Sequence, residues 1–226
     1  MTIFRQIFIA FARVSKRFSR ENLYEWLTIE LDRLPEGSKV LCIGGGGGLD
    51  GMIARHPATD TISIDIDPDR KPDMVMDATQ MTFADDDFDA VFMMEVLEHV
   101  REPQAALSEI ERVLKPGGPF VLSTPFVFGI HEEPWDYWRF TRHGLEELLR
   151  SFEVERIAPR NYYYRSIIVQ FMRTIFSPGR KRQVVGMFAI LVGSPFFLLL
   201  MLLDKIAPDD RSTTGYFAVA KKRVAG

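Results

Sequence analysis

With 226 residues, of which 46% are hydrophobic and 26% charged, the chain is long enough to bury one ordinary core and too apolar to be intrinsically disordered. Its net charge of −3 gives no general attraction to nucleic acid, so we expect no nucleic-acid partner. The single cysteine, Cys42, excludes an internal disulfide bond, in keeping with a reducing cytoplasm.

Residues 1–20 predict a basic amphipathic helix. One helical face carries the apolar residues Ile3, Phe4, Ile7, Phe8, Phe11, Val14 and Phe18. The opposite face carries the basic residues Arg5, Arg13, Lys16, Arg17 and Arg20, and the segment has no acidic residue. The basic residues end the apolar run too early for a signal peptide. Such a helix suits an anionic membrane surface.

Residues 21–159 predict an α/β core. A helix from Leu23 to Leu34 ends before Pro35 and Gly37. Short apolar runs of strand type follow at Val40–Ile43, Thr61–Ile66, Met74–Met76, Ala90–Met94 and Phe120–Thr124, with helical or loop segments such as Gln104–Leu114 between most of them. Strands that alternate with helices predict βαβ units and therefore a mostly parallel sheet.

The predicted core ends with a helix near Thr141–Ser151 and two further strands. One strand lies near Val154–Ala158 and the other near Gly215–Ala220, within the terminal segment 214–226. Because these two strands should pair in one sheet, the long segment between them must leave the core and return to it.

That segment, residues 160–213, is a hydrophobic insertion. Val184–Leu203 has no charged residue, follows Arg180-Lys-Arg182, and is as long as a membrane-spanning helix. Gly193-Ser-Pro195 divides this run, so we expect two short helical arms that form a re-entrant or interfacial hairpin, with Ser166–Phe176 in the headgroup plane. The alternative is a buried helical pair or a dimer interface in a soluble protein.

A glycine loop follows the first predicted strand. Val40-Leu-Cys-Ile43 continues into Gly44-Gly-Gly-Gly-Gly48, and glycine lets backbone N–H groups approach a ligand without interference from a Cβ atom. Asp65 lies at the end of the next strand, where a carboxylate can accept hydrogen bonds from both hydroxyls of a ribose. A dinucleotide fingerprint fits less well, because Leu49 stands where the frame that starts at the strand end needs its third glycine.

Several motifs in this order resemble class I S-adenosylmethionine-dependent methyltransferases of the type 11 family. Val40–Gly48 resembles their first motif, and Ile64-Asp-Ile-Asp-Pro68 resembles their second. Met76-Asp-Ala78 resembles the segment whose acid holds the adenine amino group. Phe88–Val100 resembles the fourth strand with the turn after it, and Leu114-Lys-Pro-Gly-Gly118 precedes the next strand as it does in that family.

The resemblance, which extends over residues 38–158 and 215–220, implies a fold and a cofactor. The fold would be a Rossmann-like α/β fold with a seven-stranded, mostly parallel sheet, helices on both faces, and the helical insertion before the last strand. The cofactor would be S-adenosyl-L-methionine, and the residues implied to bind it are Gly44, Gly45, Gly46, Gly48, Asp65, Ile66, Asp77, Ala78 and Glu95. Cys42 departs from the family, which usually has Asp or Glu there to contact the cofactor's amino group. That group would then need another acceptor, such as Glu95 or a loop carbonyl.

Two histidines are candidate catalytic residues. Methyl transfer requires an acceptor atom aligned with the sulfonium, and an oxygen or nitrogen acceptor often needs a base within about 2.6–3.2 Å of its proton. His99 follows the fourth predicted strand, on the edge where α/β sheets bind ligands, and His131 lies in the loop after the fifth strand.

The loop from His131 to Thr141 contains the candidate acceptor site. It resembles a loop of bacterial methyltransferases linked to surface-polysaccharide synthesis, and its aromatic and charged side chains suit recognition of a sugar, a ring or an anion. The substrate-binding candidates are Trp135, Asp136, Tyr137 and Arg139. The alternative is a structural lid in which the tryptophans pack and Arg139 pairs with Asp136.

A metal site is a further alternative. Glu95, Glu98 and His99, together with His131, have a spacing that resembles metal-assisted methyltransferases of ubiquinone synthesis and of small-RNA termini. Because the same letters occur in relatives without a metal, we assign no metal to the site.

The sequence therefore predicts a cytoplasmic methyltransferase that is peripheral or monotopic on the inner face of the membrane. Its acceptor would be an oxygen or nitrogen atom of a small, sugar or lipid-linked molecule. The alternatives are a soluble small-molecule methyltransferase that forms a homodimer through the insertion, an NAD-binding oxidoreductase, and a non-catalytic protein that keeps the fold.

Overall fold

A computed structural model describes residues 3–176 and 179–224 of the chain. The chain forms two compact units, and each is described by itself. The sheet unit contains residues 24–126, 130–158 and 216–226, and the helical unit contains residues 1–23, 127–129 and 159–215. Both units are therefore built from separate stretches of the chain.

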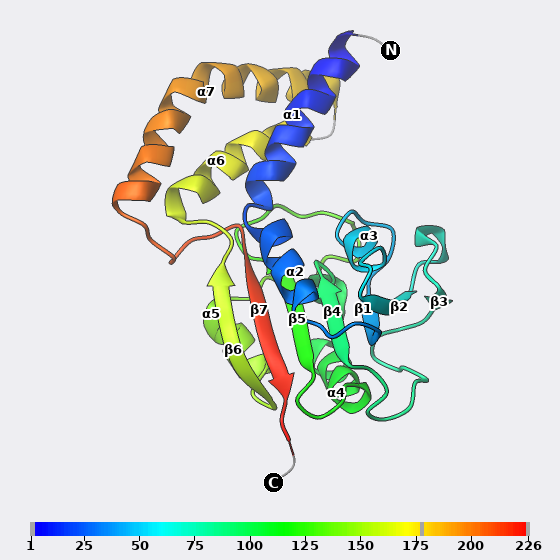
Figure 1. Cartoon of the computed structure of the whole chain (residues 1–226). Coiled ribbons are helices and arrows are strands. Elements are labelled where there is room, and N and C mark those ends of the chain that lie inside the picture. Colours follow the sequence, from blue (N-terminus) through cyan, green and yellow to red (C-terminus); the bar gives the residue numbers. More distant parts are fainter. Residues whose placement is uncertain (1–2, 177–178, 225–226) are drawn as a thin grey trace. The chain divides into compact units, whose positions relative to one another are not determined.

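The sheet unit is built on a seven-stranded sheet with the order β3-β2-β1-β4-β5-β7-β6. Its strands are β1 (Ser38–Ile43), β2 (Thr59–Asp65), β3 (Met74–Val75), β4 (Ala90–Met94), β5 (Pro119–Pro125), β6 (Phe152–Pro159) and β7 (Gly215–Lys222). The pairs β1–β2, β1–β4, β2–β3 and β4–β5 are all parallel, whereas β7 runs in the opposite direction to β6 (Figure 1). The predicted Rossmann-like fold class is confirmed.

The register of the parallel strands brings their carboxyl ends to one edge of the sheet. Ile43 of β1 lies opposite Ile64 of β2 and Met93 of β4, and the amide of Gly44 continues the ladder by donating to the Ile64 carbonyl at 2.8 Å. Asp65 in turn lies opposite Val75 of β3. The loops that follow these four strands therefore emerge side by side.

Helices cover both faces of the sheet because neighbouring strand residues point in opposite directions. On one face, Leu41 and Ile43 belong to a core that includes α4 (Pro103–Val113) and α5 (Arg142–Leu148). On the other face, α2 (Leu23–Asp32) packs Trp26 against Phe217 with ring centroids 5.5 Å apart. The short helix α3 (Asp50–Ile53) follows the glycine loop.

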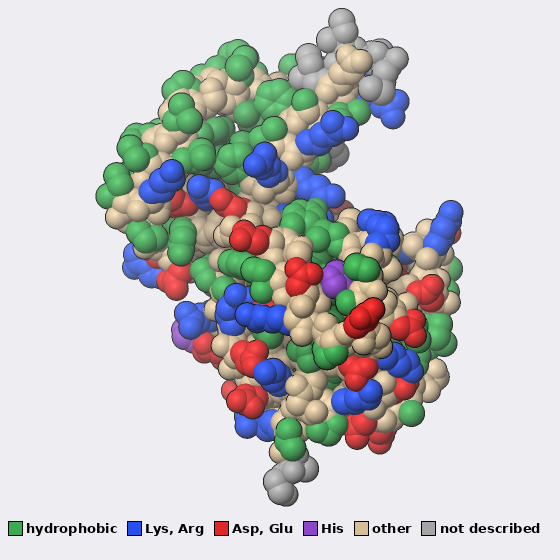
Figure 2. Space-filling model, viewed as in Figure 1, with side chains coloured by type: hydrophobic (Ala, Val, Ile, Leu, Met, Phe, Trp, Pro, Cys, Tyr) green, Lys and Arg blue, Asp and Glu red, His purple; other side chains and the backbone are tan. Residues whose placement is uncertain are grey.

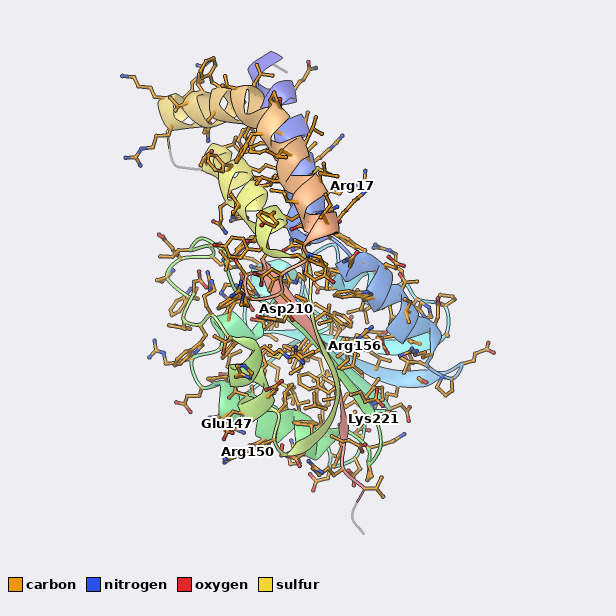
Figure 3. The ribbon with its side chains drawn as sticks, turned by 90° about the vertical axis from the view of Figure 1, so that its left-hand side faces the viewer. Arg17, Glu147, Arg150, Arg156, Asp210 and Lys221 are labelled. Carbon is orange, nitrogen blue, oxygen red and sulfur yellow. The ribbon has the colours of Figure 1, made fainter. Side chains whose placement is uncertain are left out.

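Charged side chains line the edge strand β6 and its neighbour β7 (Figure 3). Arg156 pairs with Glu30 of α2 at 3.1 Å, and Lys221 pairs with Glu155 at 2.5 Å. Charges at a sheet edge discourage pairing with a strand of another molecule.

The helical unit consists of α1 (Ile3–Ser19), α6 (Tyr163–Arg173) and α7 (Arg180–Ile206), with a single 3₁₀ turn, Thr174–Phe176, after α6. Its small apolar core contains Ile168, Met172, Ile175, Ile190, Phe197 and Leu200. Phe8, Phe11 and Phe18 of α1 pack against this core, so part of the apolar face of α1 is occupied within the unit. Ile3, Phe4 and Ile7 were also predicted to lie on this apolar face, but their side chains are outside the described part of the structure.

The helix α7 corrects the predicted hairpin. It is one continuous helix of 27 residues that contains Pro195, and Figure 1 shows it bent rather than broken. A proline inside a helix removes one hydrogen bond and clashes with the preceding turn, which a bend can accommodate when neighbouring turns remain intact. The two arms expected on either side of Gly193–Pro195 are therefore parts of a single element.

The hairpin partner of α7 is α6. The amide of Tyr164, at the start of α6, donates to the Asp204 carboxylate near the end of α7 at 3.0 Å. At the other end, a Cβ atom placed on Gly186 would lie 2.9 Å from backbone atoms of Thr174 and Ile175. The two helices therefore run antiparallel in close contact.

The insertion leaves and re-enters the sheet at one place. The amide of Arg160 donates to the Gly215 carbonyl at 2.9 Å. The buried amide group of Asn161 donates to the Thr214 hydroxyl at 2.9 Å and accepts from the Thr214 backbone at 3.0 Å. These bonds tie the first residues of the insertion to its last.

Candidate active site

The glycine loop and Asp65 form one rigid corner of the candidate site. Gly44 and Gly46 have φ of 100° and 78°, a region that only glycine occupies readily, and a Cβ atom on Gly44 would collide with Val96. The Gly45 amide donates to one Asp65 oxygen at 2.6 Å, and the Asp67 amide donates to the other at 2.8 Å. The carboxylate is thereby fixed beside the loop, at the carboxyl edge of the sheet.

The other predicted cofactor residues lie along the same edge. Asp77 follows β3 and accepts two hydrogen bonds from Thr79 at 2.8 Å, next to the buried Ala78. Glu95 follows β4 with a left-handed φ of 60° and accepts from the Ser123 hydroxyl at 3.0 Å. Ile66, beside Asp65, is 69% exposed, so its side chain is open to a ligand surface.

Cys42 is buried at the end of β1, with its sulfur 3.8 Å from the Gly44 carbonyl oxygen. Burial, together with the nearby carboxylates of Asp50, Asp73 and Asp65, raises the pKa of its thiol well above the ordinary value. The thiol is therefore neutral and does not replace the family's carboxylate. Sequence reasoning missed Asp50, which accepts from the Gly47 amide at 2.7 Å and brings a second carboxylate to the loop.

Glu98, His99 and His131 form a compact cluster after β4. Their nearest ligand atoms all lie within 4.8 Å of one another. The Glu98 side chain is fully buried, and among the described residues neither of its oxygens has a hydrogen-bond partner. The Nε2 atoms of both histidines lie 3.7 Å from the same Glu98 oxygen, and the two rings stand edge to face, with centroids 4.9 Å apart.

The two histidines differ in how their rings are held. His99 Nδ1 lies 2.6 Å from the Trp135 carbonyl oxygen, and because a carbonyl only accepts, Nδ1 must carry a proton. In the neutral ring, His99 Nε2 is therefore the atom that can accept a proton. His131 Nδ1 instead faces Asp136 at 3.4 Å and Arg139 at 3.5 Å.

Charge in this cluster shifts several pKa values. Burial raises the pKa of Glu98 above its ordinary value. Burial alone would lower the pKa of His131, but the carboxylates of Glu98 and Asp136 outweigh it, and the pKa of His131 is raised. Burial also opposes ionisation of Asp136, yet hydrogen bonds from Arg139 and from the His131 backbone hold its pKa at about 2.

The acceptor loop, defined as residues 127–141, contains an internal ion pair. Arg139 donates to both oxygens of Asp136, at 2.6 and 2.7 Å, and the Asp136 side chain is only 2% exposed. The same Asp136 accepts from the His131 backbone amide at 2.9 Å. Asp136 and Arg139 therefore have the arrangement expected of a structural brace, and they hold His131 in position.

The two tryptophans of the loop are open to solvent. Trp135 is 59% exposed and Trp138 is 43% exposed, although the Trp138 indole N–H donates to the Val100 carbonyl at 2.9 Å. Tyr137 lies under the guanidinium of Arg101, which is 5.4 Å from its ring centroid. Exposed indole faces beside two histidines are surfaces on which a planar or sugar-like acceptor can stack.

The cluster has two chemical capacities. It can move a proton, because His99 Nε2 has a lone pair and Glu98 is a buried carboxyl group. Its carboxylate and two imidazoles are also ligands that suit a divalent cation, and each histidine has a second partner that would orient it, as metal-binding histidines commonly do. Glu95, the fourth residue of the predicted metal spacing, is not part of the cluster.

Known proteins that resemble the chain include several methyltransferases. A family model described as a methyltransferase domain matches residues 41–122. The chain is 31% identical over 134 residues to a demethylmenaquinone methyltransferase of Paenarthrobacter aurescens, covering 54% of this chain and 53% of that protein. It is 34% identical over 120 residues to a ubiquinone biosynthesis O-methyltransferase of Cereibacter sphaeroides, covering 44% and 49%. The chain thus spans about half the length of these curated relatives.

A solved structure extends the likeness in fold. The phosphoethanolamine N-methyltransferase 2 of Haemonchus contortus, in complex with S-adenosyl-L-methionine, superposes with a TM-score of 0.61 over 90% of this chain and 53% of that one, at 18% identity. At that identity the likeness concerns the fold alone. A methyltransferase domain model thus matches the central part of the chain, and the chain as a whole has the fold of the class I S-adenosylmethionine-dependent methyltransferases.

Proposed function

We propose that the protein binds S-adenosylmethionine and transfers its methyl group to an oxygen or nitrogen atom of an acceptor that is dissolved in, or linked to, a membrane. The observation that carries the proposal is the corner formed by the Gly44–Gly48 loop and Asp65, with Asp77 and Glu95 on the same edge of the sheet. A strand, a glycine loop and an acid at the next strand end suit the backbone and ribose of a nucleoside cofactor.

The experiment that tests this is calorimetry with S-adenosylhomocysteine. Asp65→Ala should weaken binding by about 1.5–3 kcal/mol, because a carboxylate that accepts from ribose hydroxyls makes charge-assisted hydrogen bonds. Asp60→Ala is the matched control, since Asp60 is an exposed residue of the same strand, β2, at its other end. Absence of binding by the unaltered protein, or equal affinity of the two variants, would contradict the proposal.

The acceptor chemistry follows from the histidine cluster. His99 accepts the proton of the attacking hydroxyl or amine through Nε2, while the Trp135 carbonyl fixes its ring. The carboxylates of Glu98 and Asp136 raise the pKa of the neighbouring His131, which favours its cationic form and so the support of negative charge that develops on the acceptor. S-adenosylmethionine supplies the electrophilic methyl group, so the protein needs only to align and deprotonate the acceptor.

Membrane attachment is supported by the outer face of α7. Ten apolar side chains of this helix are between 47% and 70% exposed: Val184, Val185, Phe188, Leu191, Val192, Phe196, Leu198, Leu199, Leu202 and Ile206. Figure 2 shows hydrophobic side chains gathered over α7. The helix is long and apolar enough to cross a bilayer, but its antiparallel contact with α6 favours a monotopic arrangement within one leaflet.

Basic residues of the helical unit favour an anionic surface. Arg180, Lys181 and Arg182 precede the apolar stretch and are exposed, and Arg17 projects outward from α1 (Figure 3). Juxtamembrane basic residues each contribute about 1 kcal/mol near an anionic leaflet. A bilayer is therefore a better occupant of this face than a second copy of the chain, which would bring like charges together.

The class of acceptor is inferred from the names of the curated relatives and from the exposed side chains of each unit. Curated relatives are named for methylation of demethylmenaquinone, in ubiquinone biosynthesis, and of 2-methyl-6-phytyl-1,4-hydroquinone. Molecules of that kind have a flat ring and an apolar chain. Stacking on Trp135 would suit the ring of such an amphiphile, and the exposed apolar face of α7 would hold the enzyme at the bilayer in which the apolar chain is dissolved.

A further inference from the structure

Residues Val127–Gly129, the first part of the acceptor loop, belong to the helical unit although the residues on both sides belong to the sheet unit. Both backbone polar groups of Val127 have partners there. Its amide donates to the Thr213 carbonyl at 3.0 Å, and its carbonyl accepts from the side-chain amide of Gln170 on α6 at 2.5 Å. Val127 is thus held by the helical unit through both of its backbone polar groups.

The next residue is held by a second side chain of α6. The guanidinium of Arg173 lies over the ring of Phe128, with its carbon 3.6 Å from the ring centroid, and 5.6 Å from the ring of Phe176. A stacked arginine–aromatic pair is stabilising, and more so when it is shielded from water. Gln170 and Arg173 lie three positions apart and therefore on one face of α6.

The remainder of the acceptor loop is fastened within the sheet unit. The amide of Tyr137 donates to the Glu98 carbonyl at 3.0 Å, and Trp138 donates to the Val100 carbonyl. Only Gly129 and the five residues that follow it separate Phe128 from Trp135. The loop that carries His131 and Trp135 therefore follows directly on a segment that belongs to the helical unit.

We propose that α6, through Gln170 and Arg173, is a positioning element that couples attachment of the helical unit to a bilayer with ordering of the acceptor loop. The inference rests on the proposed membrane attachment. When α7 binds lipid, α6 is immobilised with it, because the two helices share one apolar core. The segment Val127–Gly129 is then fixed, and the following residues lose conformational freedom.

The substrate class that benefits is an amphiphile whose tail remains in the bilayer while its polar head reaches the loop. For such a molecule, a loop that is held more rigidly at the lipid surface favours binding where the substrate is found. A water-soluble analogue of the head group would meet a less rigid loop.

Tryptophan fluorescence provides a direct reading of the loop. The chain has three tryptophans, and after Trp26→Phe the two that remain, Trp135 and Trp138, both lie in the acceptor loop. The full-length Trp26→Phe protein is mixed with vesicles of phosphatidylethanolamine and phosphatidylglycerol. We expect a blue shift of the emission and a lower acrylamide quenching constant, because both indoles are substantially exposed in the structure and a loop of reduced mobility is less accessible to the quencher.

The coupling is tested with a matched pair of double variants in this background. Gln170→Ala with Arg173→Met removes both contacts to the loop. Gln104→Ala with Arg150→Met removes the same kinds of side chain from exposed positions of the sheet unit, with the same change of charge. Vesicle binding by sedimentation and S-adenosylhomocysteine affinity are measured for each, and Arg173→Lys tests whether charge without the planar guanidinium restores the response.

The expected result is that both double variants bind vesicles and S-adenosylhomocysteine, while only the α6 variant loses the emission shift and the protection from acrylamide. An unchanged shift in the α6 variant, or vesicle binding without any shift in its Trp26→Phe parent, would overturn the coupling and leave the proposed function intact. Failure of the parent to bind vesicles would instead contradict the proposed membrane attachment and this inference with it. Lost cofactor affinity in the α6 variant alone would identify Gln170 and Arg173 as general structural residues, which also overturns the coupling.

Discussion

Among single residues, His99 and His131 have different chemical environments although both face Glu98. The Trp135 carbonyl determines which nitrogen of His99 keeps its proton, whereas two carboxylates act on His131. The sequence identified both as candidates, because each follows a strand at the ligand-binding edge. It did not indicate that Glu98 is buried between them, since His131 is distant from Glu98 in the sequence and close to it only in the folded chain.

The role of His99 as a base leads to a prediction on turnover. His99→Asn retains a group that can donate to the Trp135 carbonyl but removes the Nε2 lone pair, so methyl transfer should fall roughly 10²- to 10⁴-fold. Transfer of labelled methyl to lipid or sugar extracts measures this, and S-adenosylhomocysteine affinity should be unchanged. His143→Asn is the control, because His143 is an exposed residue of α5. Equal activity of the two variants would argue against His99 as the base.

The raised pKa of His131 leads to a prediction on stability. A group whose pKa is higher in the folded protein stabilises it fully below the unfolded value, near 6.5, and that stabilisation is lost as the pH rises through the folded value. The free energy of unfolding should therefore fall more for His131→Gln at pH about 6 than at pH about 9. Denaturant titrations at both values measure this difference, and a penalty that grows with pH would contradict the ion pair.

Treatment with a chelator tests whether the cluster of Glu98, His99 and His131 binds a divalent cation. If His99 and His131 act on protons, as proposed, treatment with a chelator should leave turnover unchanged, in agreement with the absence of an assigned metal. Loss of turnover that Mg²⁺ or Mn²⁺ restores would show that the cluster holds a divalent cation. Glu98→Gln should then abolish the response to added metal, because it removes the charged ligand.

The secondary-structure elements show where sequence patterns succeed and where they stop. The strands β1, β2, β4 and β5 were predicted within a few residues, since buried parallel strands are short apolar runs bounded by glycine, proline and charge. The prediction of a hairpin within Val184–Leu203 was wrong, because Pro195 bends the helix α7 without ending it. The contacts of α6 with Val127 and Phe128 could not be predicted, since they join residues more than forty positions apart.

The packing of α7 on the end of α6 gives a prediction for one glycine. A Cβ atom on Gly186 would lie 2.9 Å from backbone atoms of Thr174 and Ile175, so Gly186→Ala should destabilise the helical unit by about 1–3 kcal/mol. Gly193→Ala, in the same helix, would meet only the ring of Phe197 at 3.3 Å and should cost less, since alanine favours helix formation. Limited proteolysis and thermal unfolding compare the two, and an equal effect would contradict the close contact.

Considered as a whole molecule, the chain should sediment with membranes, and detergent rather than high salt should release it. Salt screens the basic residues but does not weaken burial of the apolar face of α7 in lipid. Release by salt alone would indicate a purely electrostatic attachment. A soluble dimer in detergent-free buffer would instead support the alternative in which α7 forms a protein interface.

The topology of the insertion can be tested by thiol labelling after Cys42→Ser. Arg180→Cys and Asp210→Cys place a thiol just before the apolar stretch and in the loop after α7, where Asp210 is exposed (Figure 3). An impermeant reagent should label both from the same side, because the insertion leaves and re-enters the sheet at one place. Labelling from opposite sides would show that α7 spans the membrane.

The division of the chain between its units has a consequence for biosynthesis. The helical unit combines residues 1–23 with residues 127–129 and 159–215, so α1 leaves the ribosome well before the helix it packs against has been made. During that interval Phe8 and Phe11 have no protein partner from their own unit, and the nascent chain presents an apolar, basic segment. An anionic membrane or a chaperone could hold α1 in the meantime, and synthesis beside the bilayer would then place the finished protein where its acceptor is found.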